Sequence, residues 1–250
     1  MEDTMSLKDP SYERSYLYQA LKHLQVLRPL YYKILLKKWA HHSDARRFDW
    51  DWRETNYNRI AAVNLLLSKV SEPSYLEIGC ASNALFNSVP VLHKVGVDPV
   101  SGGTERKTSD DFFKSNITQF DVIFIDGLHT YEQARRDVIN SIKCLKENGW
   151  IALHDMLPRD WTEHHIPVVT RDVWCGDVWK VAFELSQTEG IDFKILKIDY
   201  GVGVFRVLKR DVALKDLAGE LRDKEFSYYY DNIKALPVVD WKDAQQWLRS

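Results

Sequence analysis

Residues 120–158 read FDVIFIDGLHTYEQARRDVINSIKCLKENGWIALHDMLP. Two apolar, β-branched runs, 120–125 and 150–153, each stop at polar residues, and the stretch between them carries apolar side chains at spacings of three and four. That spacing predicts a helix over 131–145, with Gly149 as the break before the second run. Two strands joined by one helix form a βαβ unit, so the sequence predicts neighbouring parallel strands.

The polar residues at the ends of these strands are Asp126 and His129 after the first strand, and His154 and Asp155 after the second. In an open parallel sheet, ligands bind outside the carboxyl ends of the strands. Neighbouring strands lie about 4.8 Å apart, so side chains at their tips can share one ligand. We therefore expect these four side chains to converge on one crevice. The alternatives are that Asp126 and His129 only cap the loop and the helix start, and that His154 is a strand-end histidine with satisfied hydrogen bonds.

A second strand pair lies upstream. Residues 75–80, YLEIGC, form an apolar run that ends in a glycine turn, and 95–98, VGVD, form another run that ends in an acid. A glycine lets the backbone approach a ligand closely, and a carboxylate at the tip of the next strand accepts ribose hydroxyls. Gly79 is the only glycine of this loop, because Ala81 and Asn83 stand where a dinucleotide-binding loop has its later glycines. The loop therefore favours a nucleoside without phosphates, such as S-adenosylmethionine.

Six segments together resemble one protein family. They are YLEIGCASNALF from residue 75, KVGVDPVSGGTERKTSDDFF from 94, FDVIFIDGLHTYEQARRDV from 120, GWIALHDMLP from 149, GDVWK from 176 and GVGVF from 201. In this combination the chain resembles bacterial class I S-adenosylmethionine-dependent methyltransferases, in the subgroup found in sugar, polysaccharide and natural-product pathways. The resemblance covers about residues 55–208, and FIDGLHTYE with the HD pair is its most specific part.

The resemblance implies roles for residues around the cofactor. Glu77 and Gly79 would hold the methionine end, Asp98 the ribose, and Ser109 with Asp110 the adenine. Two residues of the glycine loop and the acid after the third strand complete the set. The expected cofactor contacts are therefore Glu77, Gly79, Ser82, Asn83, Asp98, Ser109, Asp110 and Asp126.

The resemblance and the strand pattern predict an α/β fold with a Rossmann-like, mostly parallel seven-stranded sheet and helices on both faces. Helical additions are expected at both ends of the chain. We divide it into an N-terminal helical extension, 1–53, a class I methyltransferase domain, 54–210, and a C-terminal helical appendage, 211–250. By analogy with the family, 193–198 and 202–208 are expected to pair antiparallel as the last strands.

Composition agrees with one enzymatic domain. The chain has 250 residues and a hydrophobic fraction of 45%, which is enough for one α/β core. Its net charge of −2 lacks the basic excess of a nucleic-acid-binding protein. Cys80, Cys144 and Cys175 form neither a CxxC pair nor an even framework, which favours a reducing compartment and argues against a structural zinc site. No apolar stretch of about 18 residues and no signal peptide are present, so we expect a cytoplasmic protein.

The segment 14–43 has six basic residues and no acidic one, interleaved with leucines at helical spacing. Pro29 divides the expected helical region 11–41 into two helices. A basic amphipathic stretch lies on a membrane surface or packs against protein. We expect packing against the chain's own domain or a homodimer, and not membrane association, because an amphipathic helix usually buries its apolar face this way. A further helix is expected over 55–70, ahead of the first strand.

Methyl transfer needs an acceptor oxygen in line with the methyl carbon and a group that takes the hydroxyl proton. We expect His129 or His154 as the base, with Asp126 and Asp155 orienting it. Alternatively, the two acids bind a divalent cation such as Mg²⁺. Related metal-dependent enzymes have an acid or amide directly after the second acid, whereas Met156 follows Asp155 here. His129 or His154 would complete the site for a softer ion. From the resemblance, the acceptor is a hydroxyl on a sugar, polysaccharide or glycosylated natural product.

Two other classes of protein stay open. An NAD-type oxidoreductase uses a related sheet, but its phosphate-binding loop needs glycines that are missing here. A non-catalytic partner or scaffold subunit is suggested by the N-terminal extension, yet such a protein is expected to lack the crevice acids, which are all present. A comparison of NAD binding with S-adenosylmethionine binding separates the oxidoreductase from the methyltransferase.

Overall fold

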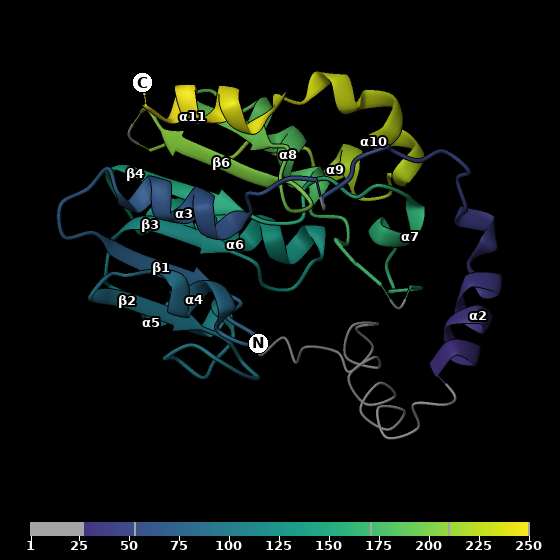
Figure 1. Cartoon of the computed structure of the whole chain (residues 1–250), viewed down its shortest axis with the longest axis horizontal. Helices are drawn as coiled ribbons and strands as arrows, with labels where there is room; N and C mark the ends of the chain where they lie inside the picture. The colour runs from purple at the N-terminus through teal and green to yellow at the C-terminus, as the bar shows by residue number, and fades with distance from the viewer. Residues whose placement is uncertain (1–27, 53, 171, 210, 250) are drawn as a thin grey trace.

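The computed structural model describes residues 28–52, 54–170, 172–209 and 211–249, and Figure 1 shows a central sheet between helices. The strands are β1 Ser74–Ile78, β2 His93–Val97, β3 Phe120–Ile125, β4 Leu145–Leu153, β5 Ile191–Leu196, β6 Val202–Val207 and β7 Val238–Val239. They form a seven-stranded sheet in the order β2-β1-β3-β4-β6-β5-β7. The first four strands of this order are parallel, β6 is antiparallel to β4 and β5, and β7 is parallel to β5. The predicted α/β fold and its mostly parallel seven-stranded sheet are confirmed.

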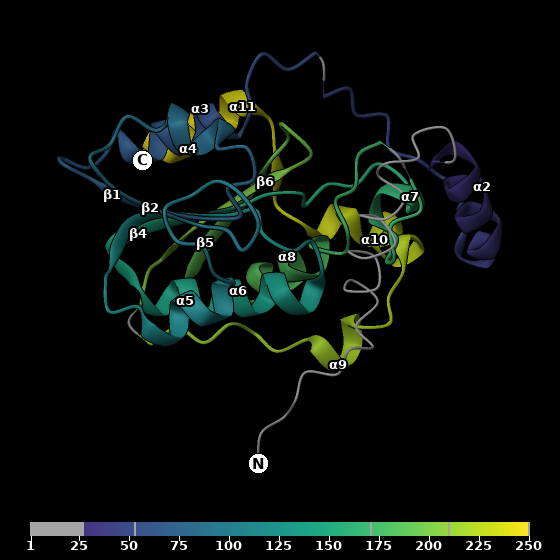
Figure 2. The same ribbon diagram turned by 90° about the horizontal axis from the view of Figure 1, so that it is seen from below.

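The helices lie on both faces of this sheet. They are α2 Arg28–Lys38, α3 Arg59–Leu67, α4 Ala84–Ser88, α5 Ser109–Ser115, α6 Tyr131–Lys143, α7 Trp161–His164, α8 Trp179–Ser186, α9 Ala218–Leu221, α10 Phe226–Asn232 and α11 Trp241–Arg249, with 3-10 turns at Ala40–His42 and Ile233–Ala235. Figure 2 shows α3, α4 and α11 on one face and α5, α6 and α8 on the other. No helix in the described parts of the chain is long and apolar enough to cross a membrane.

The alternation of side chains along β3 supplies both cores. Val122 and Phe124 point into the core beneath α3, α4 and α11, whereas Ile123 and Ile125 point into the larger core beneath α5, α6 and α8. All four are at most 1% exposed, because a central parallel strand is covered on both faces. This burial fixes the position of the polar residues that follow the strand.

The βαβ unit has the predicted order, but β4 is longer than expected. The predicted strand begins at residue 150, whereas β4 begins at Leu145, which the apolar spacing placed on the helix. Leu145 pairs with Phe120 of β3, and a bulge separates that pair from the regular pairing of Val122 with Trp150. The helix α6 therefore ends two residues before its predicted end, because Leu145 pairs with β3 and belongs to the sheet.

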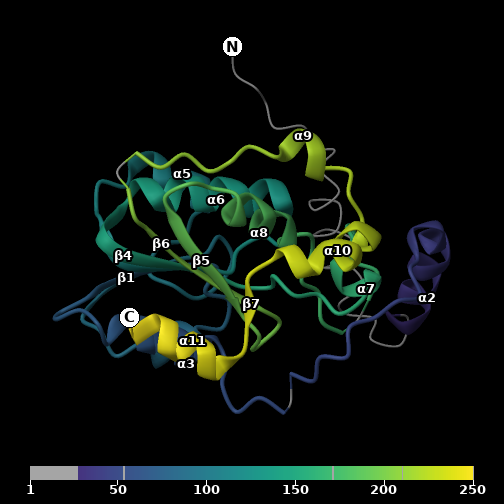
Figure 3. The same cartoon turned by 90° about the horizontal axis from the view of Figure 1, so that it is seen from above.

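The C-terminal segment completes the sheet and one of its cores. Strand β7 pairs with the outer edge of β5, and α11 lies beside α3 on the same face (Figure 3). Ala244 and Leu248 of α11 are fully buried in the core that α3 also covers. Six strands were identifiable in the sequence, and this short seventh strand was not.

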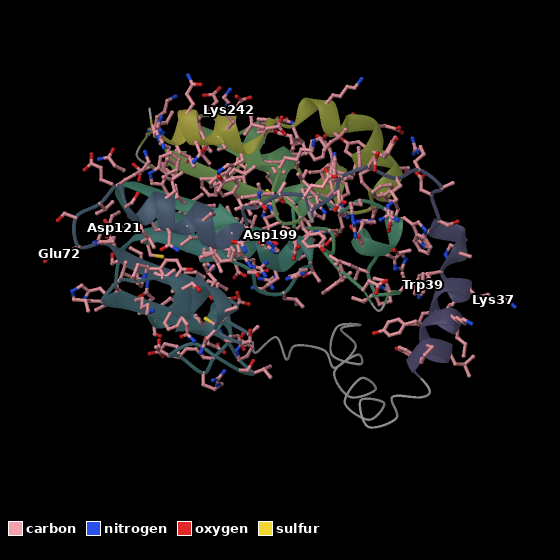
Figure 4. All side chains as sticks on the ribbon, viewed as in Figure 1. Lys37, Trp39, Glu72, Asp121, Asp199 and Lys242 are labelled. Atoms are coloured by element: carbon pink, nitrogen blue, oxygen red, sulfur yellow. The ribbon has the colours of Figure 1, made fainter. Side chains whose placement is uncertain are left out.

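The N-terminal segment stands away from the sheet. Residues 1–27 of the predicted helical region lie outside the described residues, and the described part is helical in α2 and in the turn Ala40–His42. Figure 4 shows Trp39 on the side of α2 that faces the domain and Lys37 on the opposite side. The Trp39 ring lies 5.0 Å from the ring of His165, and His42 Nδ1 lies 3.2 Å from Glu225 Oε1. The end of the segment is thereby attached to the domain.

Candidate active site

A cavity of about 910 Å³ opens at the carboxyl ends of β1, β2, β3 and β4. The walls come from both strand pairs predicted in the sequence and from the turn between β5 and β6. Predicted site residues on these walls are Gly79, Asp98, Ser109, Asp110, Asp126, His129, His154 and Asp155. The structure thus brings five of the eight expected cofactor residues and all four expected catalytic residues to one cavity.

Three predicted cofactor residues do not line this cavity. The Glu77 side chain is 2% exposed and accepts a hydrogen bond from the Tyr75 hydroxyl at 2.6 Å. Asn83 uses its side-chain oxygen to accept the backbone N–H of Gly103 at 2.7 Å, and Ser82 is exposed. Glu77 and Asn83 thus have partners within the chain, and the contact of all three residues with a cofactor stays a prediction.

Gly79 lies where the loops after β1 and β3 touch. Its φ is +86°, a conformation that glycine adopts without strain. A Cβ atom here would lie 2.0 Å from the carbonyl oxygen of Asp126. The absence of a side chain therefore allows the cofactor loop and the acid-bearing loop to lie against each other.

Asp98 organises the loop after β2. Its carboxylate accepts the backbone N–H of Ala81 at 2.9 Å and those of Val100 and Ser101 at 2.8 Å each. A carboxylate has about four lone-pair positions, so one remains for a ribose hydroxyl. Asp98 both holds the loop and keeps an acceptor at the cavity.

The start of α5 forms the side of the cavity expected to face adenine. Thr108 caps the helix by accepting the N–H of Asp111 at 3.1 Å. The Gln133 amide of α6 donates to Ser109 Oγ at 3.1 Å and to Asp110 Oδ1 at 3.3 Å. These bonds hold the two predicted residues in place at the wall.

The four predicted catalytic residues lie in contact with one another. His129 places Nε2 3.2 Å from Asp126 Oδ1 and Nδ1 3.0 Å from Asp155 Oδ2. His154 places Nδ1 3.2 Å from Asp155 Oδ1 and 3.4 Å from Asp126 Oδ1. Each histidine bridges both acids, as neighbouring parallel strands with their ends on one side allow.

This arrangement changes the protonation of the histidines. Burial alone lowers the pKa of His129, but the carboxylates of Asp155 and Asp126 outweigh it and raise the pKa to about 10. Burial also opposes the charged form of His154, and the same two carboxylates raise its pKa above the usual value. The acids around them therefore favour the charged form of His129 and shift the pKa of His154 in the same direction.

Sequence reasoning missed two charged residues of the site, Arg59 and Asp199. Arg59 opens α3 after the N-cap Asn58, and its Nη1 atom lies 2.6 Å from His154 Nε2 and 3.6 Å from Asp126 Oδ2. Asp199 lies in the turn between β5 and β6, and its Oδ2 atom is 3.5 Å from His154 Nε2. Figure 4 shows Asp199 near the tips of the strands. The signal for Asp199 was present, because the antiparallel pairing of β6 with β4 brings this turn to the carboxyl end of β4.

We call these six residues the strand-end cluster: Arg59, Asp126, His129, His154, Asp155 and Asp199. Two of its acids have left-handed backbone conformations, with φ of +62° at Asp155 and +45° at Asp199. Such conformations are strained for residues with a side chain, and they concentrate at functional sites. The strain is therefore consistent with a catalytic role for this cluster.

The loop before α8 forms the outer wall beside His129. The Trp174 ring stacks on the His129 ring at 5.3 Å with an interplanar angle of 19°. A Cβ atom at Gly176 would lie 1.7 Å from the His129 carbonyl oxygen, so this loop fits closely against the histidine. Trp174 also lines the cavity, which places an aromatic face next to the expected base.

The donor atoms of Asp126, His154 and Asp155 lie within 4.8 Å of one another, close enough for one metal ion. Two of these three residues are the predicted metal ligands. Two basic groups compete with a metal ion for these carboxylates, because the Arg59 guanidinium and the His129 imidazole face the same acids.

Residues 76–156 match a family model described as a methyltransferase domain. The matched segment is about a third of the chain and contains the strands from β1 to β4 with the loops that form most of the cavity. The match confirms the predicted methyltransferase class for this segment. No curated protein matches the chain.

Solved structures resemble the chain at low identity. A putative O-methyltransferase of Klebsiella pneumoniae has 13% identity and a TM-score of 0.49, over 77% of this chain and 96% of that chain. The O-methyltransferase of Bacillus cereus, in complex with SAH, has 13% identity and a TM-score of 0.46, over 76% and 96%. The SAH-bound methyltransferase PaMTH1 of Podospora anserina has 16% identity and a TM-score of 0.41, over 55% and 72%. Likeness at this level does not assign a substrate.

Proposed function

We propose that this chain is an S-adenosylmethionine-dependent O-methyltransferase that acts on a hydroxyl of a sugar, polysaccharide or glycosylated natural product. The proposal rests on the presence of two features in one cavity. The glycine turn and Asp98 form a nucleoside subsite, and the strand-end cluster lies beside it in a segment that matches a methyltransferase domain.

The nucleoside side of the cavity supports a cofactor without phosphates. Asp98 and Asp110 place carboxylates at this wall. Of the basic residues that line the cavity, Lys114 is the closest to them in the sequence. A pyrophosphate would meet these acids and would find only one glycine in the loop after β1. The adenosine of S-adenosylmethionine offers hydroxyls to Asp98, and its sulfonium supplies the electrophilic methyl carbon.

The acceptor side supports transfer to a hydroxyl. We propose His129 as the base, because its side chain is 23% exposed and faces the cavity, whereas that of His154 is 5% exposed. A base must be neutral before it accepts a proton, so turnover is expected to rise with pH toward the raised pKa of His129. Asp126 and Asp155 orient the imidazole and stabilise it once it is protonated.

The rim offers surfaces for a sugar ring. Trp174, Tyr200 and Leu128 line the cavity, and Leu128 is 43% exposed. Aromatic faces pack against the apolar faces of sugar rings while hydroxyls remain free for polar contacts. This composition supports the carbohydrate class of acceptor that the sequence resemblance implies.

A divalent cation does not fit the cluster as it is arranged. The ions that bind carboxylates need free oxygen lone pairs, and a positive charge close to those oxygens weakens their binding. Arg59 Nη1 lies within hydrogen-bonding distance of both ring nitrogens of His154, and His129 bridges Asp126 and Asp155. The site predicted for Mg²⁺ at Asp126 and Asp155 stays a prediction, and no step of the proposed reaction is routed through it.

Calorimetry with S-adenosylhomocysteine tests the cofactor class without knowledge of the acceptor. The wild-type protein should bind it, and Asp98→Ala should weaken binding by roughly 1.5–3 kcal/mol, the usual loss for a hydrogen bond to a charged group. Asp243→Ala, an exposed change on α11, is the matched control and should leave the affinity unchanged. Binding of NAD in place of S-adenosylhomocysteine would support the oxidoreductase instead.

Turnover tests the catalytic assignment. A panel of methyl glycosides with S-adenosylmethionine should yield S-adenosylhomocysteine with at least one acceptor. Asp126→Asn and Asp155→Asn should reduce turnover strongly and leave the affinity for S-adenosylhomocysteine unchanged, as expected for contacts made mainly in the transition state. Unchanged turnover in both variants would contradict the assignment.

The remaining parts of the proposal concern partners and location. We propose that the protein works in the cytoplasm, without a nucleic-acid partner, and that its N-terminal helices form a homodimer contact. The unpaired, buried state of Cys80, Cys144 and Cys175 agrees with a reducing compartment.

A further inference from the structure

Arg59 brings a permanent positive charge into the strand-end cluster from outside the matched methyltransferase segment. Its Nη1 atom lies 2.6 Å and 3.0 Å from the two ring nitrogens of His154 and 3.6 Å from Asp126 Oδ2, while its Nε atom lies 3.7 Å from Asp199 Oδ2. A guanidinium keeps its charge at every pH at which proteins are folded and can only donate hydrogen bonds. The charge of this group is therefore a fixed part of the cavity.

The position of Arg59 is held at two points. Asn58 caps α3 by accepting the N–H of Ile60 at 3.0 Å, which fixes the start of the helix. The backbone N–H of Arg59 donates to Asp199 Oδ2 at 3.0 Å, so the acid that faces the guanidinium also holds its main chain. The side chain is 33% exposed and lines the cavity, so it reaches the reacting region and is not a surface charge.

The acidic residues of the strand-end cluster have their basic partners within the same cluster. Its acids are Asp126, Asp155 and Asp199, and its basic groups are Arg59 and two histidines. Each acid lies within 4 Å of two or more basic groups. An ion bound by Asp126, His154 and Asp155 would lie next to the Arg59 guanidinium, and two positive charges at that distance repel each other.

We propose that Arg59 takes the place of a divalent cation in this cavity: its positive charge holds Asp126 and Asp199 in position. This inference rests on the proposed methyl transfer. In that transfer an electron pair of the acceptor oxygen forms the bond to the methyl carbon, the carbon–sulfur pair returns to sulfur, and the hydroxyl proton passes to His129. Arg59 acts on this step as a positioning residue.

Mn²⁺ titration by calorimetry tests the proposal without an acceptor. We expect no specific Mn²⁺ binding by the wild-type chain. Arg59→Gln should bind one Mn²⁺ with an affinity at least about tenfold above the detection limit of the titration, because the change removes the repelling charge and keeps a long polar side chain. Arg59→Lys keeps the charge and should behave like the wild type, and Arg222→Gln, which removes an exposed arginine on the surface, is the matched control.

A second variant identifies the site of the gained ion. In the double variant Arg59→Gln with Asp155→Asn, the Mn²⁺ affinity should fall back to the wild-type level. A merely structural role for Arg59 would lower stability without creating a cation site, so thermal unfolding of each variant is recorded beside the titrations.

Equal Mn²⁺ affinity of the wild type and Arg59→Gln, including no binding by either, overturns the proposal. A wild-type chain that binds one Mn²⁺ and loses it in Asp155→Asn overturns it as well. Neither result touches the methyltransferase assignment, which fails separately if the wild type does not bind S-adenosylhomocysteine.

Discussion

At the scale of single residues, Gly79 connects the cofactor loop to the acid-bearing loop. Its φ is positive, and a Cβ atom placed on it would lie only 2.0 Å from the Asp126 carbonyl oxygen, so there is no room for a side chain. The same contact sets the distance between the nucleoside subsite and the strand-end cluster. Gly79 thus matters for the geometry of both halves of the site.

Gly79→Ala should destabilise the fold by more than about 2 kcal/mol, because it adds left-handed strain to a clash with backbone atoms. Gly219 in α9 is the matched control, since a Cβ atom there would meet nothing within 4 Å. Gly219→Ala should be neutral or stabilise by up to about 1 kcal/mol. Urea unfolding measures both, and equal stabilities of the two variants would contradict the close approach at Gly79.

Glu77 is the buried acid of the loop after β1, and its protonation gives a second prediction. Burial raises the pKa of Glu77 to about 7, more than the hydrogen bond from Tyr75 lowers it. The folded chain therefore binds this proton more tightly than the unfolded chain, so the contribution of Glu77 to stability falls as pH rises from about 4.5 to about 7. Above that window the loss is complete.

Glu77→Gln should be more stable than the wild type at pH 8, by a difference on the order of 3 kcal/mol, from about 1.4 kcal/mol for each unit of pKa. The amide oxygen can still accept the hydrogen bond from the Tyr75 hydroxyl, so the buried donor keeps its partner. At pH 4.5 the two proteins should differ little. Urea unfolding at both pH values is the measurement, and a variant that is less stable at pH 8 would refute the raised pKa.

The residues of the site differ in how far the sequence reveals them. Asp126 and Asp155 follow buried strands directly, so the strand pattern alone brings them to one edge of the sheet. Arg59 is on a helix and Asp199 is in a hairpin turn, and their approach to His154 depends on how those elements pack. The expected antiparallel pairing of the last strands brings the Asp199 turn to this edge, but no spacing in the sequence encodes how α3 packs, so the position of Arg59 was not predicted.

At the scale of secondary-structure elements, the C-terminal segment has a structural role that its sequence did not show. Strand β7 has two residues, too few for an alternating pattern, so only its pairing with β5 identifies it. The helix α11 lies within the segment 211–250 that the sequence predicts to be helical. The division at residue 210 stays a prediction, although the structure places the residues after it in the sheet and in the core.

Leu248→Ala on α11 should destabilise the protein by about 2–4 kcal/mol, the usual effect of a cavity at a fully buried leucine. Gln246→Ala on the exposed side of the same helix should change stability by less than about 0.5 kcal/mol. Chemical unfolding of the two variants compares them directly. A small effect of Leu248→Ala would mean that α11 is only loosely attached to the sheet.

At the scale of the whole molecule, the N-terminal helix α2 stands away from the sheet, so its role does not follow from the fold of the sheet. Leu30 and Ile34 of α2 are 56% and 57% exposed, beside exposed Lys33 and Lys37. The sequence predicts that this segment serves self-association or docking onto the domain. The contacts of Trp39 and His42 with the domain agree with attachment at its end, and the homodimer stays a proposal.

Removal of residues 1–45 should lower the mass of the particle in light scattering from a dimer to a monomer, because the exposed apolar and basic residues of α2 are lost. The affinity for S-adenosylhomocysteine should stay the same, since none of the described residues 28–45 lines the cavity. An unchanged mass would argue against self-association. Binding of the full chain, but not of the shortened chain, to anionic vesicles would favour the membrane alternative.

The late position of β7 in the chain has a consequence for synthesis on the ribosome. Strand β5 is complete roughly forty residues before β7 is made, so its outer edge has no partner during that interval. At about 5–20 residues per second the interval lasts a few seconds. During that time an open strand edge is offered to neighbouring nascent chains, so we expect the yield of soluble protein to depend on how densely ribosomes translate this message.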